Sequence, residues 1–246
     1  MMNVHCDPLV TIMTITDKAP YKTTFSAIAG QINMQDLSDF RKEYTAGRLT
    51  SEALTEHPVD LLKIWLDDAI KAKLPDPNAM TVATVDATGQ PSQRIVLLKD
   101  LSSEGFVFYT NLGSRKAKDL AHNSKISLHF PWYFLERQVR VNGVAKALTR
   151  SEVAKYFLSR PKDSQLGAWA SQQSQPISTR ELLVIQFAQM KEKFANTQVP
   201  LPDFWGGFRV EPQQIEFWQG GEYRLHDRFE YNKQDNGSWT TQRLMP

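Results

Sequence analysis

Cysteine, long apolar runs and an excess of charge of one sign are all scarce in this sequence of 246 residues. The one cysteine, Cys6, cannot form an intrachain disulfide, and no cluster of cysteine and histidine has the spacing of metal ligands. No apolar run approaches the roughly 18 to 20 residues that cross a bilayer. The formal net charge is only +2, so no bulk field attracts nucleic acid. We therefore expect a metal-free protein of the reducing cytoplasm that binds neither membranes nor nucleic acids.

The first 33 residues contain no arginine, and their two lysines are offset by two aspartates. An Arg-rich transit peptide and a signal peptide with a basic start are therefore poor fits. The composition is mixed and shows no sustained period, so we expect residues 1–33 to form a loosely ordered extension. Met34 is an alternative start, and residues 34–246 are expected to form a single domain.

The rest of the pattern is mixed, with strands dominating the middle and the end of the chain. Helices are predicted over residues 36–44, 58–74 and 114–123, and two more at the capping-box patterns Thr149–Glu152 and Ser178–Glu181. The second of these two carries an apolar stripe expected to face the core, formed by Leu183, Phe187, Met190 and Phe194. Strands are predicted over residues 80–86, 93–99, 105–110, 125–130, 138–148, 207–210, 214–218, 223–231 and 238–244. Many antiparallel strands with a few inserted helices indicate a mainly β (α+β) fold, a closed or partly closed barrel with peripheral helices.

A helix start that carries two cations is the clearest sign of a ligand site. Within residues 111–116 a strand ends, Gly113 turns the chain, and Ser114 is placed to cap the next helix. Arg115 and Lys116 then lie where the helix dipole favours negative charge, which is unfavourable unless an anion binds between them. A phosphate would draw on the free backbone amides and on both side chains. A solvated basic helix start is the alternative.

Two other groups of cations are weaker signals. Arg94 and Lys99 bracket an apolar strand; unpaired buried charges there would be costly, although both ends could simply reach solvent. Tyr156 and Arg160 share a helix face if that helix persists, and Ser164 lies just beyond. A phenol, a guanidinium and a hydroxyl that converge could hold a phosphate, with surface decoration as the alternative.

The segment Ile215–Arg228 is the fourth candidate. Arg224, His226 and Arg228 share one face if residues 223–231 form a strand. Such groups repel unless negative charge lies opposite, and nearby glutamates offer a salt-bridged surface as one explanation. The neighbouring tryptophan and a pair of glycines favour a ligand site instead, because glycine lets the backbone approach a flat ring closely.

Together these clusters resemble ordered blocks of the pyridoxamine 5'-phosphate oxidase family. Residues 215–228 look like the family's signature, an aliphatic-Glu-aromatic-Trp-Gln followed by Arg-Leu-His-Asp-Arg. Further blocks resemble the family in the same order at Arg41–Tyr44, Arg94–Lys99, Tyr109–Lys116, Glu136–Val139, Tyr156–Ser164, Gln173-Ser174 and Phe204–Gly207. The resemblance runs from about Leu37 to Pro246 and leaves only the N-terminal extension uncovered.

The resemblance implies an FMN-binding split β-barrel of the Greek-key type and a homodimer with FMN at the subunit interface. It implies FMN contacts from Arg94, Ile95, Val96, Leu97, Leu98, Lys99, Tyr109, Thr110, Arg115, Lys116, Gln138, Gln173, Ser174, Trp218 and Arg228. It implies that the substrate phosphate is held by Lys99, Tyr156, Arg160 and Ser164. It implies catalytic roles at the reacting end for Arg224 and His226, with Leu225 beside them, and closure of the site by Arg41, Lys42, Glu43 and Tyr44.

In the implied reaction, a hydride passes from C4′ of the substrate to FMN. Pyridoxine 5'-phosphate gives pyridoxal 5'-phosphate directly, whereas pyridoxamine 5'-phosphate gives an imine that water hydrolyses to the same aldehyde and NH3. O2 then reoxidises the flavin to yield H2O2. Two departures from the family pattern are Lys42, where arginine is common, and Leu158, where many relatives have histidine. The alternatives are another split-barrel flavoenzyme, such as a flavin reductase, a pyridoxal-phosphate carrier without activity, and a nucleic-acid-binding barrel, which would need its basic residues in a stripe with exposed aromatics.

Overall fold

The structure is a computed structural model that describes residue 37 and residues 40–246. The chain divides into two compact units, Met1–Lys42 and Glu43–Pro246. The predicted extension over residues 1–33 and the alternative start Met34 lie outside the described residues. The helix predicted over residues 36–44 is wrong for residues 40–44, which are not helical. A helix of only nine residues is marginally stable unless its side chains pack against the rest of the protein along a helical face. The side chains of Glu43 and Tyr44 instead contact the loop that follows β7 and the end of that strand.

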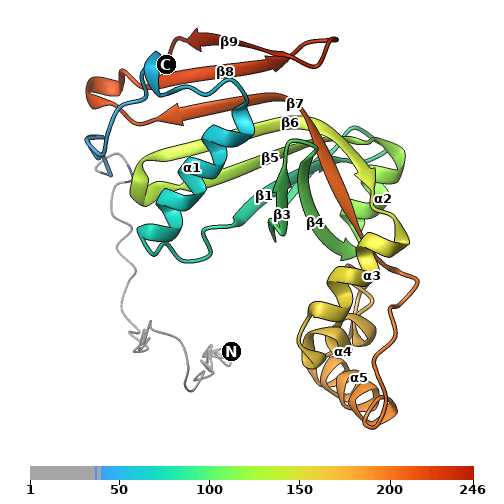
Figure 1. Ribbon diagram of the computed structural model, residues 1–246. Coiled ribbons are helices and arrows are strands. Elements are labelled where there is room, and N and C mark those ends of the chain that lie inside the picture. The colour runs from blue at the N-terminus through green and yellow to red at the C-terminus, as the bar shows by residue number, and fades with distance from the viewer. Residues whose placement is uncertain (1–36, 38–39) are drawn as a thin grey trace, which may run out of the picture. The chain divides into compact units, whose positions relative to one another are not determined.

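The second unit is built on an antiparallel sheet. Its strands are β1 (Ala79–Val85), β2 (Pro91–Leu97), β3 (Asp100–Ser102), β4 (Gly105–Asn111), β5 (Lys125–Trp132), β6 (Arg137–Ala147), β7 (Trp205–Gln219), β8 (Asp227–Lys233) and β9 (Trp239–Leu244). The order is β2-β1-β5-β6-β7-β4-β3, and β8 pairs with β7 and β9 (Figure 1). The turns predicted between β1 and β2 and between β8 and β9 are confirmed, and each uses a glycine with positive φ, Gly89 or Gly237.

β7 is one long strand where two were predicted. Residues 205–210 pair with β4 and residues 214–219 pair with β8, while β6 runs beside both parts. The ladder between β6 and β7 shifts register between Asn142 and Gly143. A Cβ on Gly143 would lie 2.3 Å from the carbonyl oxygen of Glu211, so glycine permits this close approach. The gap between the two predicted strands is therefore a bulge that bends one continuous strand.

β8 begins at Asp227, four residues later than predicted. Glu222–Arg224 form a short 3-10 turn instead, and two consecutive residues there have φ of 55° and 64°. The prediction that Arg224, His226 and Arg228 share one strand face is therefore wrong. The start of β8 is fixed because the buried carboxylate of Asp227 accepts hydrogen bonds from a backbone amide and from arginine side chains.

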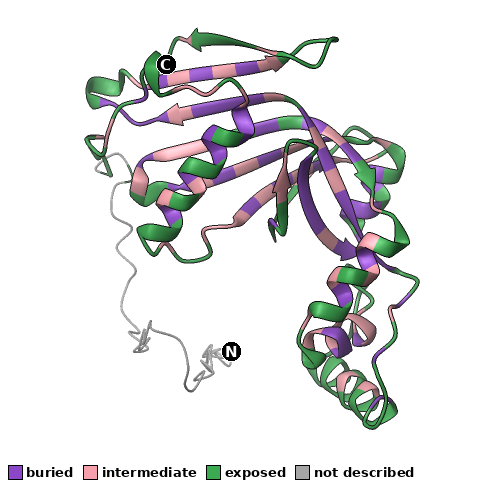
Figure 2. Ribbon diagram, in the orientation of Figure 1, coloured by how far each residue is buried: buried purple, intermediate pink, exposed green. Residues whose placement is uncertain are grey.

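The helices of the second unit are α1 (Pro58–Lys71), α2 (Arg115–His122), α3 (Arg150–Ser159), α4 (Lys162–Ala170) and α5 (Arg180–Lys193). α1 lies across one face of the sheet (Figure 1), where the rings of Trp65 and Phe217 meet edge to face with centres 5.2 Å apart. The buried faces of α1 and the sheet form the main core (Figure 2). α3 and α4 pack around a second core that includes Phe157, Leu166 and Trp205. α4 was not predicted. No helix among the described residues is long and apolar enough to span a bilayer.

The two predicted capping boxes differ in outcome. At α3 the box is confirmed, because Thr149 and Glu152 each bond the other's backbone amide. At α5 it is wrong by one position. The N-cap is Thr179, whose hydroxyl accepts from the backbone N–H of Leu182, so Glu181 lies too early to close a box.

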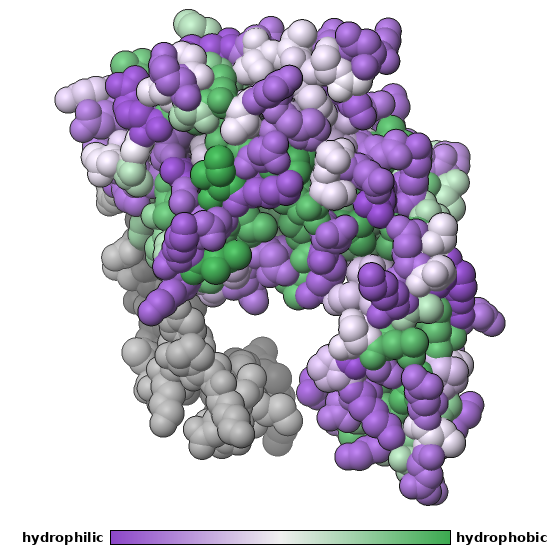
Figure 3. Space-filling model, viewed as in Figure 1, coloured by the Kyte–Doolittle hydropathy of each residue, from purple (hydrophilic) through white to green (hydrophobic). Residues whose placement is uncertain are grey.

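The apolar stripe on α5 is only partly buried. Phe194 is buried and Phe187 and Met190 pack against the second core, but Leu183 is 40% exposed, so its predicted core position is wrong. The reason is that α5 packs against α4 and lies away from the sheet (Figure 1). Figure 3 shows the resulting mixture of apolar and polar surface on this helical part.

Candidate active site

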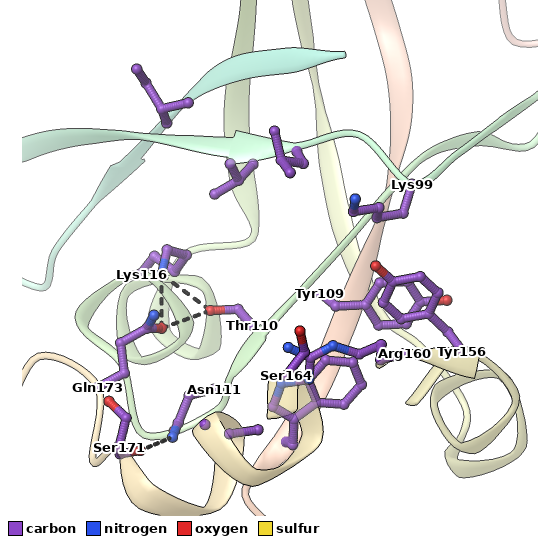
Figure 4. Close-up of a pocket in the computed structure, with 16 residues that line it drawn as sticks. Lys99, Tyr109, Thr110, Asn111, Lys116, Tyr156, Arg160, Ser164, Ser171 and Gln173 are labelled. Carbon is purple, nitrogen blue, oxygen red and sulfur yellow. Dashed lines mark hydrogen bonds between the residues drawn. The ribbon is translucent and has the colours of Figure 1, made fainter. Parts of the chain in front are cut away.

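A pocket of about 530 Å³, here named the β4 pocket, lies between β2, β4 and the helices α3 and α4 (Figure 4). It gathers side chains that are far apart in the sequence. They are Ile95, Val96, Leu97, Lys99, Tyr109, Thr110, Asn111, Lys116, Tyr156, Arg160, Ser164, Gly167, Ala168, Ser171, Gln173 and Trp205. Most of them were predicted to contact FMN or the substrate phosphate, so the structure brings the two predicted groups to one cavity.

Three stacked aromatic rings form one wall of the β4 pocket. The ring centre of Tyr109 lies 4.0 Å from that of Tyr156 and 5.3 Å from that of Trp205, with interplanar angles of 10° and 1°. The guanidinium of Arg160 lies 4.8 Å from the ring centre of Trp205. Its Nη1 is buried without a hydrogen-bond partner among the described residues, and burial lowers the pKa of Arg160. An unsatisfied buried donor at a cavity is suited to an anionic ligand atom.

The start of α2 lies at another side of this pocket. Ser114 is the N-cap, as predicted, but its side chain bonds no backbone amide of the helix. Lys116 is 7% exposed, and its Nζ donates to Thr110 Oγ1 at 3.1 Å and to Gln173 Oε1 at 3.2 Å (Figure 4). It forms no ion pair with a described residue, and burial together with the charge of Arg94 lowers its pKa. A buried ammonium with only neutral partners fits a negatively charged ligand, because an unpaired buried charge is costly.

Arg94 does not line the β4 pocket, but its side chain is held firmly. It donates to Thr84 Oγ1 and to Ser92 Oγ, both at 2.7 Å, and its Nη2 lies 4.0 Å from Asp119. Asp119 is itself buried and accepts from Thr84 at 2.6 Å. Burial lowers the pKa of Arg94, and the charge of Asp119 opposes that change. Arg94 is therefore anchored within β2, whereas Lys99 lies two residues beyond the end of that strand, is exposed and extends toward the pocket (Figure 4).

A second group of predicted residues surrounds Trp218 on β7. The ring centre of Tyr44 lies 5.6 Å from that of Trp218 and 5.5 Å from that of His226, and the latter two lie 4.6 Å apart. The guanidinium of Arg224 lies 5.7 Å from the ring centre of Tyr44. A Cβ on Gly220 would lie 2.8 Å from atoms of Tyr44. The flat ring that approaches the glycine pair is therefore that of a tyrosine of the same chain. We name Tyr44, Trp218, Arg224 and His226 the Trp218 cluster.

Arg228 carries the salt bridge that the sequence left open. Its Nε donates to the buried carboxylate of Glu216 at 2.8 Å, Arg140 donates to the same carboxylate, and Nη1 of Arg228 donates to the carbonyl oxygen of Met245. Burial would raise the pKa of Glu216, but the two arginines outweigh it and lower that pKa. A pocket of about 230 Å³ lies here, lined by Gln138, Arg140, Glu216, Trp218, Arg228 and Pro246.

The predicted site residues thus fall into two groups that share no pocket among the described residues. Outside both pockets lie the buried Leu98 and the exposed Arg115, Ser174 and Leu225. Glu43 accepts a hydrogen bond from the backbone N–H of Tyr223 at 3.3 Å, whereas Arg41 and Lys42 belong to the first unit. Five lining residues of the β4 pocket were not among the predicted site residues: Asn111, Gly167, Ala168, Ser171 and Trp205. Among residue 37 and residues 40–246, no group of His, Cys, Asp and Glu is placed to hold a metal ion.

Comparison with protein families gives two matches that together cover most of the second unit. Residues 66–194 match the model described as pyridoxamine 5'-phosphate oxidase. Residues 205–246 match the model described as the pyridoxine 5'-phosphate oxidase C-terminal dimerisation region. The second match contains β7, β8 and β9 and so includes Trp218, Arg224, His226 and Arg228.

Curated relatives carry the same description along nearly their whole length. The pyridoxine/pyridoxamine 5'-phosphate oxidase of Alteromonas mediterranea is 65% identical over 210 residues, which is 85% of this chain and 99% of the relative. The enzyme of the same description from Vibrio vulnificus is 62% identical over 211 residues, 86% of this chain and 100% of the relative.

Solved structures agree on the architecture. PhzG from Burkholderia lata, in complex with tetrahydrophenazine-1-carboxylic acid, superposes with a TM-score of 0.76 at 30% identity, over 80% of this chain and 98% of that one. A pyridoxamine 5'-phosphate oxidase-related, FMN binding protein from Nostoc punctiforme superposes with a TM-score of 0.64 at 13% identity, over 78% of this chain and 100% of that one, and shows the fold alone. The predicted split-barrel fold is confirmed. With two family models and full-length relatives in agreement, the chain belongs to the pyridoxamine 5'-phosphate oxidase family.

Proposed function

We propose that the chain oxidises pyridoxamine 5'-phosphate and pyridoxine 5'-phosphate to pyridoxal 5'-phosphate, with FMN as its cofactor and O2 as its electron acceptor. The alcohol and O2 give the aldehyde and H2O2; the amine, O2 and one water give the aldehyde, NH3 and H2O2. Bound FMN would supply the redox chemistry by accepting a hydride from C4′ and passing the electrons to O2. The chain's own residues would bind and orient the substrate.

The observation that carries the substrate class is the buried Nη1 of Arg160 at the β4 pocket, which has no hydrogen-bond partner within the part of the chain that the structure describes. Lys99, Tyr156 and Ser164 line the same cavity, so an ammonium, a phenol and a hydroxyl are available beside the guanidinium. A phosphate monoester supplies the oxygens that such donors require, and a planar guanidinium can bind two of them at once. We assign these residues to the substrate phosphate.

The residues beside the start of α2 fit the phosphate of FMN. Lys116 is a buried cation without a negative partner among residues 40–246, and Arg94 is held in place by Thr84, Ser92 and Asp119. The first turn of α2 adds backbone N–H groups, and Arg115 lies at its first position. Ile95, Val96, Leu97 and Gln173 line the pocket beside this phosphate site and would contact the rest of the bound FMN.

We assign Tyr44, Arg224 and His226 of the Trp218 cluster to the reacting end of the substrate. Arg224 and His226 would act on the substrate near C4′, with Tyr44 and Glu43 closing the site, and Arg41, Lys42 and Leu225 are assigned there by the family pattern. Gln138, Trp218 and Arg228 would contact FMN. Because these residues and the β4 pocket share no cavity among the described residues of one copy, we propose a homodimer in which each FMN lies between the β4 pocket of one copy and the Trp218 side of the other. The match to a dimerisation region over residues 205–246 supports this arrangement.

Reconstitution with FMN followed by oxygen uptake tests the proposal. The FMN-loaded protein should consume O2 with pyridoxamine 5'-phosphate, while pyridoxamine without its phosphate should lose most of kcat/KM because the Arg160 group then has no ligand. A protein that binds pyridoxal 5'-phosphate but consumes no oxygen with either phosphorylated substrate is a carrier. That result, or failure to bind FMN, would overturn the proposal.

A further inference from the structure

The loop that follows β7 holds the imidazole of His226 by one ring nitrogen. The backbone N–H of Gly221 donates to Nδ1 of His226 at 3.2 Å. A Cβ on Gly221 would lie 2.4 Å from the carbonyl oxygen of Leu225, so the loop can close in this way only with glycine at that position. The backbone N–H of His226 donates in turn to the carbonyl oxygen of Arg224 at 3.0 Å. The imidazole is therefore oriented by the main chain and by the rings of Tyr44 and Trp218.

This hydrogen bond determines where the proton of the neutral ring lies. A ring nitrogen that accepts an N–H cannot carry a proton itself, so a neutral imidazole bonded through Nδ1 carries its proton on Nε2. Burial, and after it the positive charges of Arg224 and Arg228, lower the pKa of His226, which favours the neutral ring. The other rings in contact with the imidazole are the phenol ring of Tyr44 and the indole of Trp218.

We infer that His226 serves the reaction as a hydrogen-bond donor through Nε2–H, that it does not serve as a proton acceptor, and that Gly221 is the positioning residue that fixes this role. The inference rests on the proposed function only in placing His226 at the substrate. An imidazole with its proton on Nε2 can stabilise negative charge on a substrate oxygen by donating a hydrogen bond. In that form Nε2 cannot remove a proton from the C4′ hydroxyl or ammonium.

A general-base role would require the opposite tautomer. Nε2 would have to be free of its proton before the reaction, which moves that proton to Nδ1 in the neutral ring. Nδ1–H would then face the N–H of Gly221, donor against donor, at the position where the structure has a hydrogen bond. Either the loop or the ring would have to turn away, and the close packing of Gly221 against Leu225 opposes movement of the loop.

The tautomer can be observed directly by ¹⁵N NMR of histidine-labelled, FMN-loaded protein, with the His226 signals assigned from their loss in His226→Gln. We expect an unprotonated Nδ1 and a protonated Nε2 at neutral pH. Protonation on Nδ1, or a fully protonated ring, would overturn the inference. This measurement needs no turnover, so it stands even if the protein fails to oxidise either substrate and the proposed function falls.

Two substitutions separate the roles in catalysis. The amide nitrogen of His226→Gln can donate near the position of Nε2 but cannot titrate, whereas His226→Asn can accept from Gly221 but offers no donor at Nε2. If His226 acts as a donor, the His226→Gln variant should retain kcat/KM within about 10-fold with an unchanged pH profile, whereas His226→Asn should lose kcat/KM by on the order of 100-fold. If His226 acts as a base, both variants should lose kcat/KM by on the order of 100-fold or more, and the acid limb of the pH profile should disappear. His122→Gln, on the exposed last turn of α2, is the matched control and should change neither quantity.

Discussion

Trp205 and Arg160 form a stacked pair in which the guanidinium lies 4.8 Å from the ring centre, while its Nη1 is buried without a hydrogen-bond partner in the described part of the chain. Arg160 was predicted from the sequence to bind the substrate phosphate, whereas Trp205 was not among the predicted site residues. Trp205 stacks on Tyr109, and Tyr109 stacks on Tyr156, so the guanidinium lies against a wall of three rings. Arg160 is thus oriented before a ligand arrives, which reduces the entropy lost on binding.

Arg160→Ala should raise KM for pyridoxamine 5'-phosphate roughly 100-fold and change kcat by only a few-fold, because charge-assisted hydrogen bonds to the phosphate are lost in ground state and transition state alike. Arg160→Lys keeps the charge but loses the planar fork and the stacking on Trp205, so an intermediate rise of about 10-fold is expected. Steady-state oxygen uptake measures both. Arg180→Ala, at the exposed start of α5, is the control. A fall in kcat at constant KM would contradict the assignment.

Arg224→Ala should show the complementary pattern, a larger loss of kcat than Arg160→Ala. Arg224 lies outside the β4 pocket, in an exposed turn at φ 64°, beside Tyr44 and His226. A non-glycine residue in the left-handed region carries strain, which is characteristic of positions fixed for function. The comparison uses the same assay for both variants. If Arg224→Ala raised only KM while Arg160→Ala lowered kcat, the division of roles would be reversed.

Lys116→Met should separate cofactor affinity from stability. Removing the buried ammonium loses its bonds to Thr110 and Gln173 but also removes a desolvated charge, so the free energy of unfolding of the FMN-free protein should stay within about 1 kcal/mol of its original value. The Kd for FMN should rise about 10- to 100-fold, because one charge-assisted contact to the phosphate is lost. Fluorescence titration with FMN and urea unfolding measure the two effects. Lys118→Met, exposed on the same helix, should change neither, and a loss of stability without a loss of FMN affinity would argue for a purely structural lysine.

Gly220→Ala tests the packing of Tyr44 in the Trp218 cluster. The new methyl group would lie 2.8 Å from Tyr44 atoms, so the ring has to move, at a cost of about 1 to 3 kcal/mol in the free energy of unfolding. We expect kcat/KM to fall about 10-fold as Tyr44 leaves Trp218 and His226. Gly47→Ala is the matched control, because the nearest atom to its new Cβ is 4.0 Å away. Equal behaviour of the two variants would show that Tyr44 adjusts freely.

Local patterns predicted most of the fold. Alternation and turn residues located the strands and the hairpin at Gly89, because both are set by neighbours in the sequence. The errors came where tertiary contacts decide. β7 continues through Pro212 because β6 pairs with it on both sides of the bulge, and residues 223–226 leave the strand because buried contacts fix Asp227. The strand β6 that pairs with β7, and the residues Leu49 and Arg243 that bind Asp227, all lie far from their partners in the sequence.

The candidate site shows the same division. The cations and hydroxyls were identified from their residue types and from the family resemblance, and many of them line the β4 pocket. Trp205 was visible only as part of the resembling block Phe204–Gly207, since its stacking on Tyr109 joins β7 to β4. The hydrogen bond from Gly221 to His226 depends on a turn that the sequence analysis took for a strand. The protonation of His226 could therefore be inferred only from the structure.

Asp227→Asn should destabilise the protein in a manner that depends on pH. Burial alone would raise the pKa of Asp227, but hydrogen bonds from Arg243, from the backbone N–H of Leu49 and from Arg48 outweigh it and lower that pKa below its ordinary value of 3.8. A carboxyl group with a lowered pKa in the folded state contributes stability above its unfolded pKa and loses it as pH falls through the folded pKa.

At pH 7 the substitution should therefore lower the free energy of unfolding by about 2 kcal/mol, since the arginines lose a charged acceptor while the amide can still accept from Leu49. The gap between the two proteins should narrow progressively as the pH is lowered below about 4, because the original side chain is then protonated too. Urea unfolding at pH 7 and at stepwise lower pH measures the gap. Asp235→Asn, in the exposed turn between β8 and β9, should show no gap at any pH. A gap for Asp227→Asn that stays constant with pH would mean that the shape of the side chain, and not its charge, anchors the start of β8 next to His226.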